Sequence, residues 1–204
     1  MNNSVFNTEL QQQNISSKIV VGLERISEAF KSLIWQIAKT INLSPIQIQI
    51  MIFIAYHKKE LCNVSYLAKE FNVTKPTISD AVKVLENKNL ITKKYSKKDS
   101  RSFSIILSAK GKKAVDKISG FANPIKDEVE KISSEELLQL YNSLNQLIHR
   151  LNKAGILSVQ RICYTCNFYE KNKDNHFCKL LNLKLSEKDI RIDCPDFEEL
   201  ELAE

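Results

Sequence analysis

Two long amphipathic patterns occur at opposite ends of the first 155 residues. In the first, apolar residues recur at intervals of three and four, at Ile19, Leu23, Ile26, Phe30, Leu33 and Ile37. The second comprises Leu137, Tyr141, Leu144, Ile148 and Leu151. This period places each set along one face of a helix, and the capping pair Ser133 and Glu136 marks where the second helix begins. We call each of these apolar helix faces a seam. Two seams can pack against each other within one chain or between two chains, and we favour the second arrangement, a homodimer.

Shorter patterns between the two seams predict three helices and a β-hairpin. Ser44 and Pro45 suit the cap and first turn of a helix that runs to Tyr56. The short run SYLAKEF follows, and a third helix begins with Thr74 as its cap in TKPTISDAVKVLENKN. The β-prone runs LITKKY and SFSIILS then enclose the polar loop SKKDSR, as the strands of a hairpin do. This order is that of a winged helix-turn-helix, so we predict a mainly α fold with a small β-hairpin wing.

The net charge of +6 is distributed unevenly along the chain. Residues 1–160 contain 23 basic and 14 acidic side chains, whereas the remaining 44 residues contain 7 and 10. Eight basic residues and one acidic residue fall between Lys93 and Lys113, in and around the predicted hairpin. A basic surface of this kind suits a polyanionic partner, although charge alone is equally consistent with a solvated lysine-rich face.

The third predicted helix separates its side chains into two faces. Ile78, Val82 and Leu85 lie on one side and can face a core. The other side carries polar and basic groups, at Lys75, Thr77, Ser79, Asp80 and Lys83. In a winged helix-turn-helix this helix enters the major groove, where hydroxyls and lysines reach phosphates and the helix N-terminus favours an anion. We therefore predict that this second set contacts double-stranded DNA.

Three segments together resemble the MarR family of bacterial and archaeal transcription regulators. They are LSPIQIQIMIFIA, VSYLAKEFNVTKPTISDAVKVLENKNLI and KKDSRSFSIILSAKG, and the resemblance extends over residues 17 to 155. Its most specific part is the wing, where DSR precedes an apolar strand and then SAKG. The resemblance implies a homodimer built from the terminal helices that reads a roughly palindromic site. It also implies a small aromatic molecule or an oxidant as effector, but the first helix lacks the cysteine of oxidant-sensing relatives.

The wing loop contains the remaining residues that we predict to contact DNA. The resemblance implies that Arg101 enters the minor groove and that Asp99 helps to position it. A narrow minor groove concentrates negative potential, which attracts an arginine. Lys97 and Lys98 precede this pair in the same basic loop and are predicted to contact DNA as well.

Four of the five cysteines lie in the last 44 residues, at Cys163, Cys166, Cys178 and Cys194. Four thiolates in a short module suit a tetrahedral metal site, and about 40 residues bury too little apolar surface to fold unaided. We predict zinc, although a zinc ribbon would show two C-x-x-C pairs and this tail shows one. An iron–sulfur cluster is one alternative, because a proline follows Cys194. Thiols that bind no metal or form disulfides are the other. His176 is a further candidate, in place of one cysteine.

The predicted organisation has four parts: a flexible N-terminal arm at 1–16, a helical dimerisation region at 17–43 and 122–156, a winged helix-turn-helix DNA-binding domain at 44–121, and a cysteine-rich metal-binding module at 161–204. Because the start of the chain has neither a basic region nor an apolar run, and IMIFIAY is too short to span a membrane, we expect a cytoplasmic location.

The sequence offers no arrangement that predicts catalysis. Its four glycines are scattered, and no histidine neighbours a plausible nucleophile, so we predict that the chain is not an enzyme. Cys62, His57 and His149 are interpreted as core or polar-edge residues. The predicted function is sequence-specific DNA binding by a transcription regulator with a metal-bearing tail. The alternative is a winged-helix module that binds protein, carries a structural zinc tail and has no sequence-specific DNA function.

Overall fold

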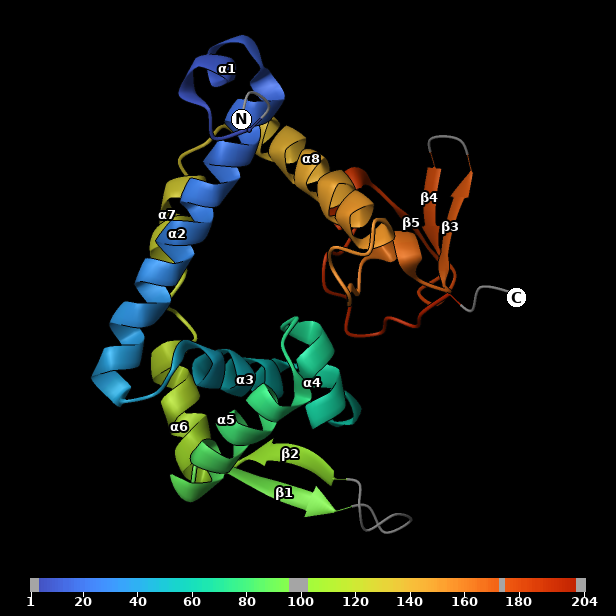
Figure 1. The fold of residues 1–204 in the computed structure, drawn as a ribbon. Coiled ribbons are helices and arrows are strands. Elements are labelled where there is room, and N and C mark those ends of the chain that lie inside the picture. The colour runs from blue at the N-terminus through green and yellow to red at the C-terminus, as the bar shows by residue number, and fades with distance from the viewer. Residues whose placement is uncertain (1–3, 96–102, 173–174, 201–204) are drawn as a thin grey trace.

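The computed structural model of the protein describes residues 4–95, 103–172 and 175–200. In chain order its helices are α1 (Thr8–Gln13), α2 (Ile15–Ile41), α3 (Pro45–Tyr56), α4 (Val64–Glu70), α5 (Lys75–Asn87), α6 (Ala109–Ile118), α7 (Asn123–Val129) and α8 (Ser134–Lys153). Its strands are β1 (Ile91–Tyr95), β2 (Phe103–Leu107), β3 (Tyr169–Asn172), β4 (Asn175–Cys178) and β5 (Leu183–Leu185). Short 3-10 turns are η1 (Lys59–Leu61), η2 (Cys163–Thr165) and η3 (Glu187–Asp189). The fold is mainly helical, as predicted (Figure 1).

The elements α3, α4, α5 and the β1–β2 hairpin form the predicted winged helix-turn-helix (Figure 1). Ser44 and Gln47 make a reciprocal capping box at the start of α3. Thr74 caps α5 by accepting the N–H of Thr77. Between α4 and α5 the backbone turns at Asn72, whose φ of 51° is one that asparagine adopts more readily than most residues. Local sequence therefore fixes where each of these helices begins.

One core holds the winged helix-turn-helix together. Its fully buried side chains come from every layer: Ile48, Ile50, Met51, Leu67, Ile78, Leu85, Ile91, Ile105 and Ile118. Burial of one such side chain stabilises the fold by about 1.5–3 kcal/mol. The hairpin pairs antiparallel, and the Ile105 N–H also donates to the Cys62 carbonyl at 2.7 Å. This bond attaches the base of the wing to the segment that precedes α4.

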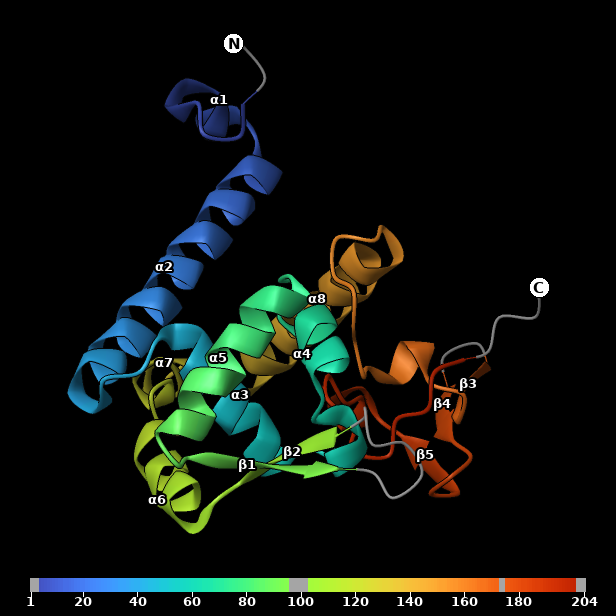
Figure 2. The ribbon, with the colours of Figure 1, turned by 60° about the horizontal axis from the view of Figure 1, so that its bottom comes forward.

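The helix α2 begins and ends near the predicted positions, but much of its seam has no partner within the described chain. Ile34 and Ala38, near its C-terminal end, are buried in the common core. Ile19, Ile26 and Phe30 are 53%, 51% and 41% exposed. Figure 2 shows α2 standing apart from α8, so the two predicted seams do not bury each other along their length. The short helix α1 lies within the segment expected to be a flexible arm.

The helix α8 begins at the predicted cap, Ser133. It lies beside the cysteine-rich tail (Figure 1), which it contacts from near its middle. The Tyr141 hydroxyl donates to the Ile190 carbonyl, and the Asn142 amide donates to the Glu187 carboxylate. The tail of the same chain therefore covers part of the second seam, an arrangement that helix periodicity does not reveal.

The tail folds as a three-stranded antiparallel sheet in the order β3-β4-β5, flanked by η2 and η3. Its core is small: Cys163, Leu185 and Ile190 are buried, with Tyr169 packed against them. Outside this core Leu183 remains half exposed. No single helix in the described part of the chain is long and apolar enough to cross a membrane.

Candidate nucleic-acid interface and cysteine cavity

The solvent-facing side of α5 is polar and basic. Ile78, Val82 and Leu85 are buried, as the sequence predicts for the inner face. Exposed on the outer face are Lys75, Thr77, Ser79, Asp80 and Lys83. The Thr77 hydroxyl lies 2.8 Å from that of Thr74, at the helix N-terminus. This face is therefore accessible to a ligand. Contact of these residues with DNA stays a prediction.

The predicted wing residues Lys97, Lys98, Asp99 and Arg101 lie outside the described residues. The hairpin is described up to Tyr95 and again from Phe103. Within it, Lys93 pairs with Glu86 of α5 at 2.6 Å and lies 5.3 Å from the ring centroid of Phe103. One member of the basic run is thus paired with a carboxylate of the same chain and links the wing to α5.

All four cysteines of the tail line one cavity. Cys163 lies on η2, Cys166 directly follows it, Cys178 ends β4, and Cys194 follows η3. Within the C-x-x-C pair the Cys166 N–H donates to the Cys163 carbonyl at 3.0 Å, which closes a tight turn. The cavity itself is small, with about 20 Å³ available to the centre of a water-sized sphere. The fold therefore brings together thiols that stand up to 31 positions apart.

Backbone and side-chain donors point at two of these sulfurs. The Arg191 N–H donates to Cys163 Sγ at 3.2 Å, and the Arg191 guanidinium lies 3.6 Å from Cys194 Sγ. Burial raises the pKa of the Cys163 thiol; the bond from Arg191 opposes this shift, and the three neighbouring thiols add to it. Four crowded thiolates would repel one another, so this arrangement is suited to a positively charged occupant.

In the described part of the chain, no group of three or more His, Cys, Asp or Glu side chains is arranged to hold one metal ion. His176 bonds to the Tyr169 hydroxyl and is not among the described residues that line the cavity. The predicted zinc site and the alternative iron–sulfur site both stay predictions.

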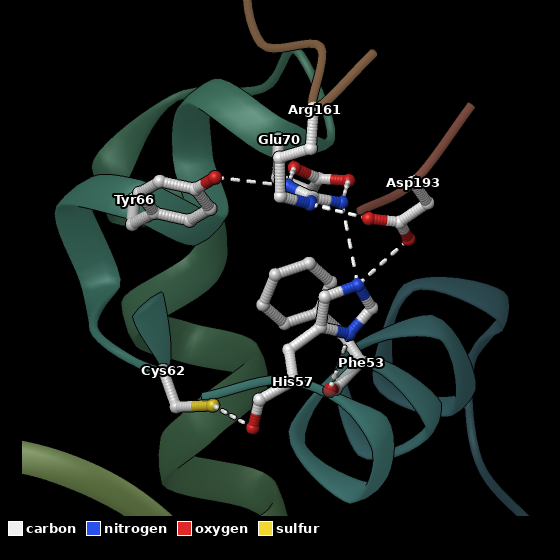
Figure 3. Close-up of polar contacts among 7 residues, drawn as sticks. All are labelled: Phe53, His57, Cys62, Tyr66, Glu70, Arg161 and Asp193. Atoms are coloured by element: carbon white, nitrogen blue, oxygen red, sulfur yellow. Dashed lines mark hydrogen bonds and ion pairs between the residues drawn. The ribbon is translucent and has the colours of Figure 1, made fainter. Parts of the chain in front are cut away.

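A buried arginine joins the tail to the helix-turn-helix (Figure 3). Arg161 Nη1 and Nη2 donate to the two oxygens of Glu70 on α4, at 2.7 and 3.1 Å. Its Nη1 also donates to the Tyr66 hydroxyl at 2.8 Å, and its Nε donates to Asp193 at 2.6 Å. The guanidinium carbon lies 5.3 Å from the ring centroid of Phe53 on α3. We call these five residues, together with His57, the Arg161 cluster.

Charge is well compensated within the Arg161 cluster. Burial disfavours the charged guanidinium of Arg161, but bonds to Glu70, Asp193 and Tyr66 outweigh burial and raise its pKa. The bond with His57, followed by the bond from Arg161, holds the pKa of Asp193 well below its usual range. His57 Nε2 lies 2.9 Å from Asp193, and its ring stacks on Phe53 at 3.8 Å. His57 is therefore part of a joint between segments and not an isolated polar-edge residue.

The other singled-out residues have local roles. Cys62 is buried, and its thiol donates to the Lys58 carbonyl at 3.4 Å. Burial raises the pKa of Cys62 to about 11, with a smaller contribution from Glu60. This agrees with its interpretation as a core residue. His149 on α8 lies 5.4 Å from the ring of Tyr164, at the border with the tail.

Part of this chain is similar to a known protein family. Residues 41–102 match the model of the MarR family. This MarR match runs from the end of α2 to the wing, the part of the chain that carries the helix-turn-helix. It stops well before the cysteine-rich tail. No curated protein matches the chain.

Solved structures share the fold of the MarR-matched region. Staphylococcus aureus MepR in its DNA-binding conformation has a TM-score of 0.58 at 23% identity, covering 65% of this chain and 98% of MepR. The S. aureus MepR–DNA complex gives 0.57 at 23% identity, covering 65% and 97%. The transcriptional regulator PA3341 gives 0.58 at 20% identity, covering 66% and 98%. At these identities the structural likeness shows a shared fold and nothing more, and each comparison leaves about a third of this chain unmatched.

The Arg161 cluster is the feature that sequence reasoning missed. Its members come from three separate stretches: 53–70, residue 161 and residue 193. Neither helical period nor motif spacing connects positions that stand about 90 residues apart. The only available sign is that Arg161 and Asp193 are the charged residues nearest to the cysteines at 163 and 194.

Proposed function

We propose that this chain is a MarR-like transcription regulator that binds specific double-stranded DNA sites as a homodimer. The observation that carries the proposal is the exposed polar face of α5, set in a winged helix-turn-helix beside a lysine-rich hairpin. In this fold α5 is the helix that enters the major groove. The related MepR has been solved in complex with DNA, which supports the same use of the fold here.

The exposed apolar face of α2 supports the proposed dimer. Ile19, Ile26 and Phe30 expose apolar surface along one helix, and a second copy of the chain would cover it. A two-fold dimer presents two copies of α5, so we expect a site with two inverted half-sites. Arg101 of each wing would enter the adjacent minor groove, and Asp99 would position it.

The tail is proposed to carry a metal cofactor on Cys163, Cys166, Cys178 and Cys194. Support comes from the convergence of all four thiols on one cavity. A metal supplies stabilisation that so small a core lacks.

Charge removal on α5 tests the DNA-binding face. Lys75→Ala combined with Lys83→Ala should weaken binding to a fragment enriched from a random DNA pool. Each lysine that contacts a phosphate contributes about one unit to the slope of log affinity against log salt, so the slope should fall by about two. Lys39→Ala, an exposed lysine on α2, is the control and should leave affinity and slope unchanged. An unchanged slope in the double variant would reject this face as the DNA contact.

Arg101→Ala tests the wing. Affinity for the same fragment should fall by at least about tenfold, which corresponds to about 1.4 kcal/mol. Sedimentation should show the same oligomer as wild type, because the wing lies far along the chain from the seams. Wild-type affinity in this variant would contradict the assigned role of Arg101.

The competing function is a winged-helix module whose wing contacts protein. The salt dependence of binding affinity distinguishes the two functions. Phosphate contacts make affinity fall steeply as the salt concentration rises, whereas binding through a protein interface is much less sensitive to salt. Absence of any DNA sequence preference, together with a salt-insensitive protein partner, would favour this second function.

A further inference from the structure

A second and much larger cavity lies between the tail, the helix-turn-helix and the C-terminal end of α8. About 760 Å³ of it is available to the centre of a water-sized sphere, against about 20 Å³ in the cysteine cavity. Tyr66 and Lys69 of α4 line it, together with Lys153 of α8 and residues from two stretches of the tail, 158–165 and 194–200. We call this space the tail cavity. It is large enough for a drug-sized ligand.

Hydrogen bonds fasten the walls of the tail cavity to one another. The Ser158 hydroxyl donates to the Lys69 carbonyl on α4 at 2.5 Å. The Asn152 amide on α8 donates to the Leu157 carbonyl at 2.8 Å. The Arg161 cluster belongs to the same border, since Arg161 itself lines the cavity. The tail cavity is therefore a product of tail docking, and it exists only while the tail is held against α4 and α8.

Apolar and aromatic side chains cover much of the lining. Leu61, Val159, Tyr164, Phe197 and Leu200 all belong to it. Leu200 is 43% exposed even though the chain folds around this space. A molecule that entered the cavity would remove such apolar surface from water, which favours binding. We therefore expect the body of a ligand to be apolar.

The charged groups of the lining favour an anion. Lys58 and Arg161 already pair with carboxylates of the same chain. Lys69 and Lys153 form no ion pair within the described part of the chain. Glu199 is the one carboxylate among the described residues of the lining. Two uncompensated lysines against one carboxylate leave a positive balance, which attracts a negative group and is screened by salt.

We propose that the tail cavity binds a small organic anion whose apolar body contacts the aromatic lining and whose acidic group pairs with Lys69 and Lys153. Such a ligand touches α4, α8 and the tail at once. It binds the docked tail and not the undocked tail, so it stabilises the docked arrangement by mass action. The tail thus has a role beyond its cysteines, because it completes a ligand site that the winged helix-turn-helix does not form alone.

A matched pair of fluorescent dyes tests the chemistry of the site. Anilinonaphthalene sulfonate carries an aromatic body and a sulfonate, and N-phenylnaphthylamine carries the same body without the charge. The full-length chain should bind the sulfonate saturably, at one molecule per chain and at least about fivefold more tightly than the neutral dye, a difference typical of one or two exposed charge pairs. Added salt should narrow this difference. Equal affinity of the two dyes at low salt, or absence of saturable binding, would overturn the proposal.

Charge-reversal variants locate the bound dye. Lys69→Glu combined with Lys153→Glu should lower the affinity for the sulfonate at least about tenfold and leave that for the neutral dye unchanged. Lys18→Glu combined with Lys39→Glu makes the same change of net charge at exposed positions of α2 and should alter neither affinity. This control also reports on the exposed apolar face of α2, which is another surface for an aromatic dye. Weaker sulfonate binding in the α2 variant alone would place the dye there and contradict the proposal.

Val159→Trp fills part of the cavity without changing its charge. Both dyes should then bind at least about tenfold more weakly. Val20→Trp, at a position of α2 that is 44% exposed, is the matched control and should leave both affinities unchanged. Wild-type affinity of Val159→Trp for both dyes would show that they bind outside the cavity.

Amide hydrogen exchange tests whether the ligand bridges the tail and the helix-turn-helix. Pro195 and Phe197 line the cavity, so the bound sulfonate should slow exchange around residues 191–197. The change should reach up to about a hundredfold at a dye concentration a hundred times its Kd. Exchange in α6, none of whose residues lines the cavity, should stay unchanged. Unaltered exchange at 191–197 with the dye bound would overturn the bridging position of the site.

Discussion

Replacement of Arg161 by methionine tests how the tail is attached to the helix-turn-helix. Methionine keeps an unbranched apolar stem but removes the guanidinium. The variant loses two bonds to Glu70, one to Tyr66 and one to Asp193. It also leaves Glu70 on α4 without the cation that compensates its charge.

The size of the effect follows from burial. The side chains of Arg161 and Glu70 are only 8% and 18% exposed, so water cannot easily replace the lost partner. Removal of one member of a buried ion pair destabilises by about 3–5 kcal/mol. Asp193 is 47% exposed and keeps its bond with His57, so loss of the Arg161–Asp193 ion pair adds little to the destabilisation. We expect the docked state of the tail to lose about 3 kcal/mol.

Amide hydrogen exchange followed by mass spectrometry measures this local opening directly. A loss of about 3 kcal/mol should accelerate exchange around residues 191–197 by on the order of a hundredfold, because the Cys194 N–H donates to the Arg161 carbonyl. Arg25→Met, at an arginine that is 78% exposed on α2, is the matched control and should leave exchange unchanged. Adding Glu70→Gln to Arg161→Met should restore part of the protection, since the stranded charge is removed.

Exchange in Arg161→Met that stays within about threefold of wild type, the change that about 0.7 kcal/mol would produce, would contradict this prediction. The prediction is also wrong if Glu70→Gln accelerates exchange as much in Arg161→Met as it does in wild type. That result would mean that the two side chains are not coupled.

Three further predictions follow from local geometry. The Cys62 thiol, buried with a pKa of about 11, should resist alkylation at pH 8 in the native state and react only after unfolding, as peptide mapping of the alkylated chain would show. Ile26→Glu, at a position that is 51% exposed on α2, should convert the dimer to monomer in sedimentation while Tyr56→Glu does not; a stable Ile26→Glu dimer would exclude the seam as the interface. Gly111→Ala places a Cβ 1.9 Å from the Leu90 carbonyl oxygen, so it should lower the free energy of unfolding by about 1–3 kcal/mol or more in urea titration, whereas Gly22→Ala, which meets nothing within 4 Å, should not.

Elements specified by neighbouring residues could be predicted from the sequence. Ser44, Thr74 and Ser133 each cap the helix that the sequence assigned to them. The apolar faces of α5 and the pairing of the wing strands also follow from period and strand propensity. The caps depend on residues within one helical turn, and the wing pairing depends on two strands that one short loop joins.

Long-range arrangements could not be predicted in the same way. Helix periodicity marks Tyr141 as a seam residue but cannot show that Ile190 of the tail, and not another helix, is its partner. The four cysteines were assigned to one site from their number, but their convergence on a cavity depends on how η2, β4 and η3 pack. The hydrogen bonds of Arg161 depend on how the whole tail packs against the helix-turn-helix. Hydrophobic periodicity in the sequence does not indicate that packing.

Selection from a random DNA pool with the full-length chain, followed by affinity measurements near physiological salt, tests the central claim most directly. We predict enrichment of a roughly palindromic site that binds at least about a thousandfold more tightly than a scrambled fragment of the same length. Equal affinity for the enriched and scrambled fragments would contradict sequence-specific DNA binding. That result would favour a winged helix that binds another partner.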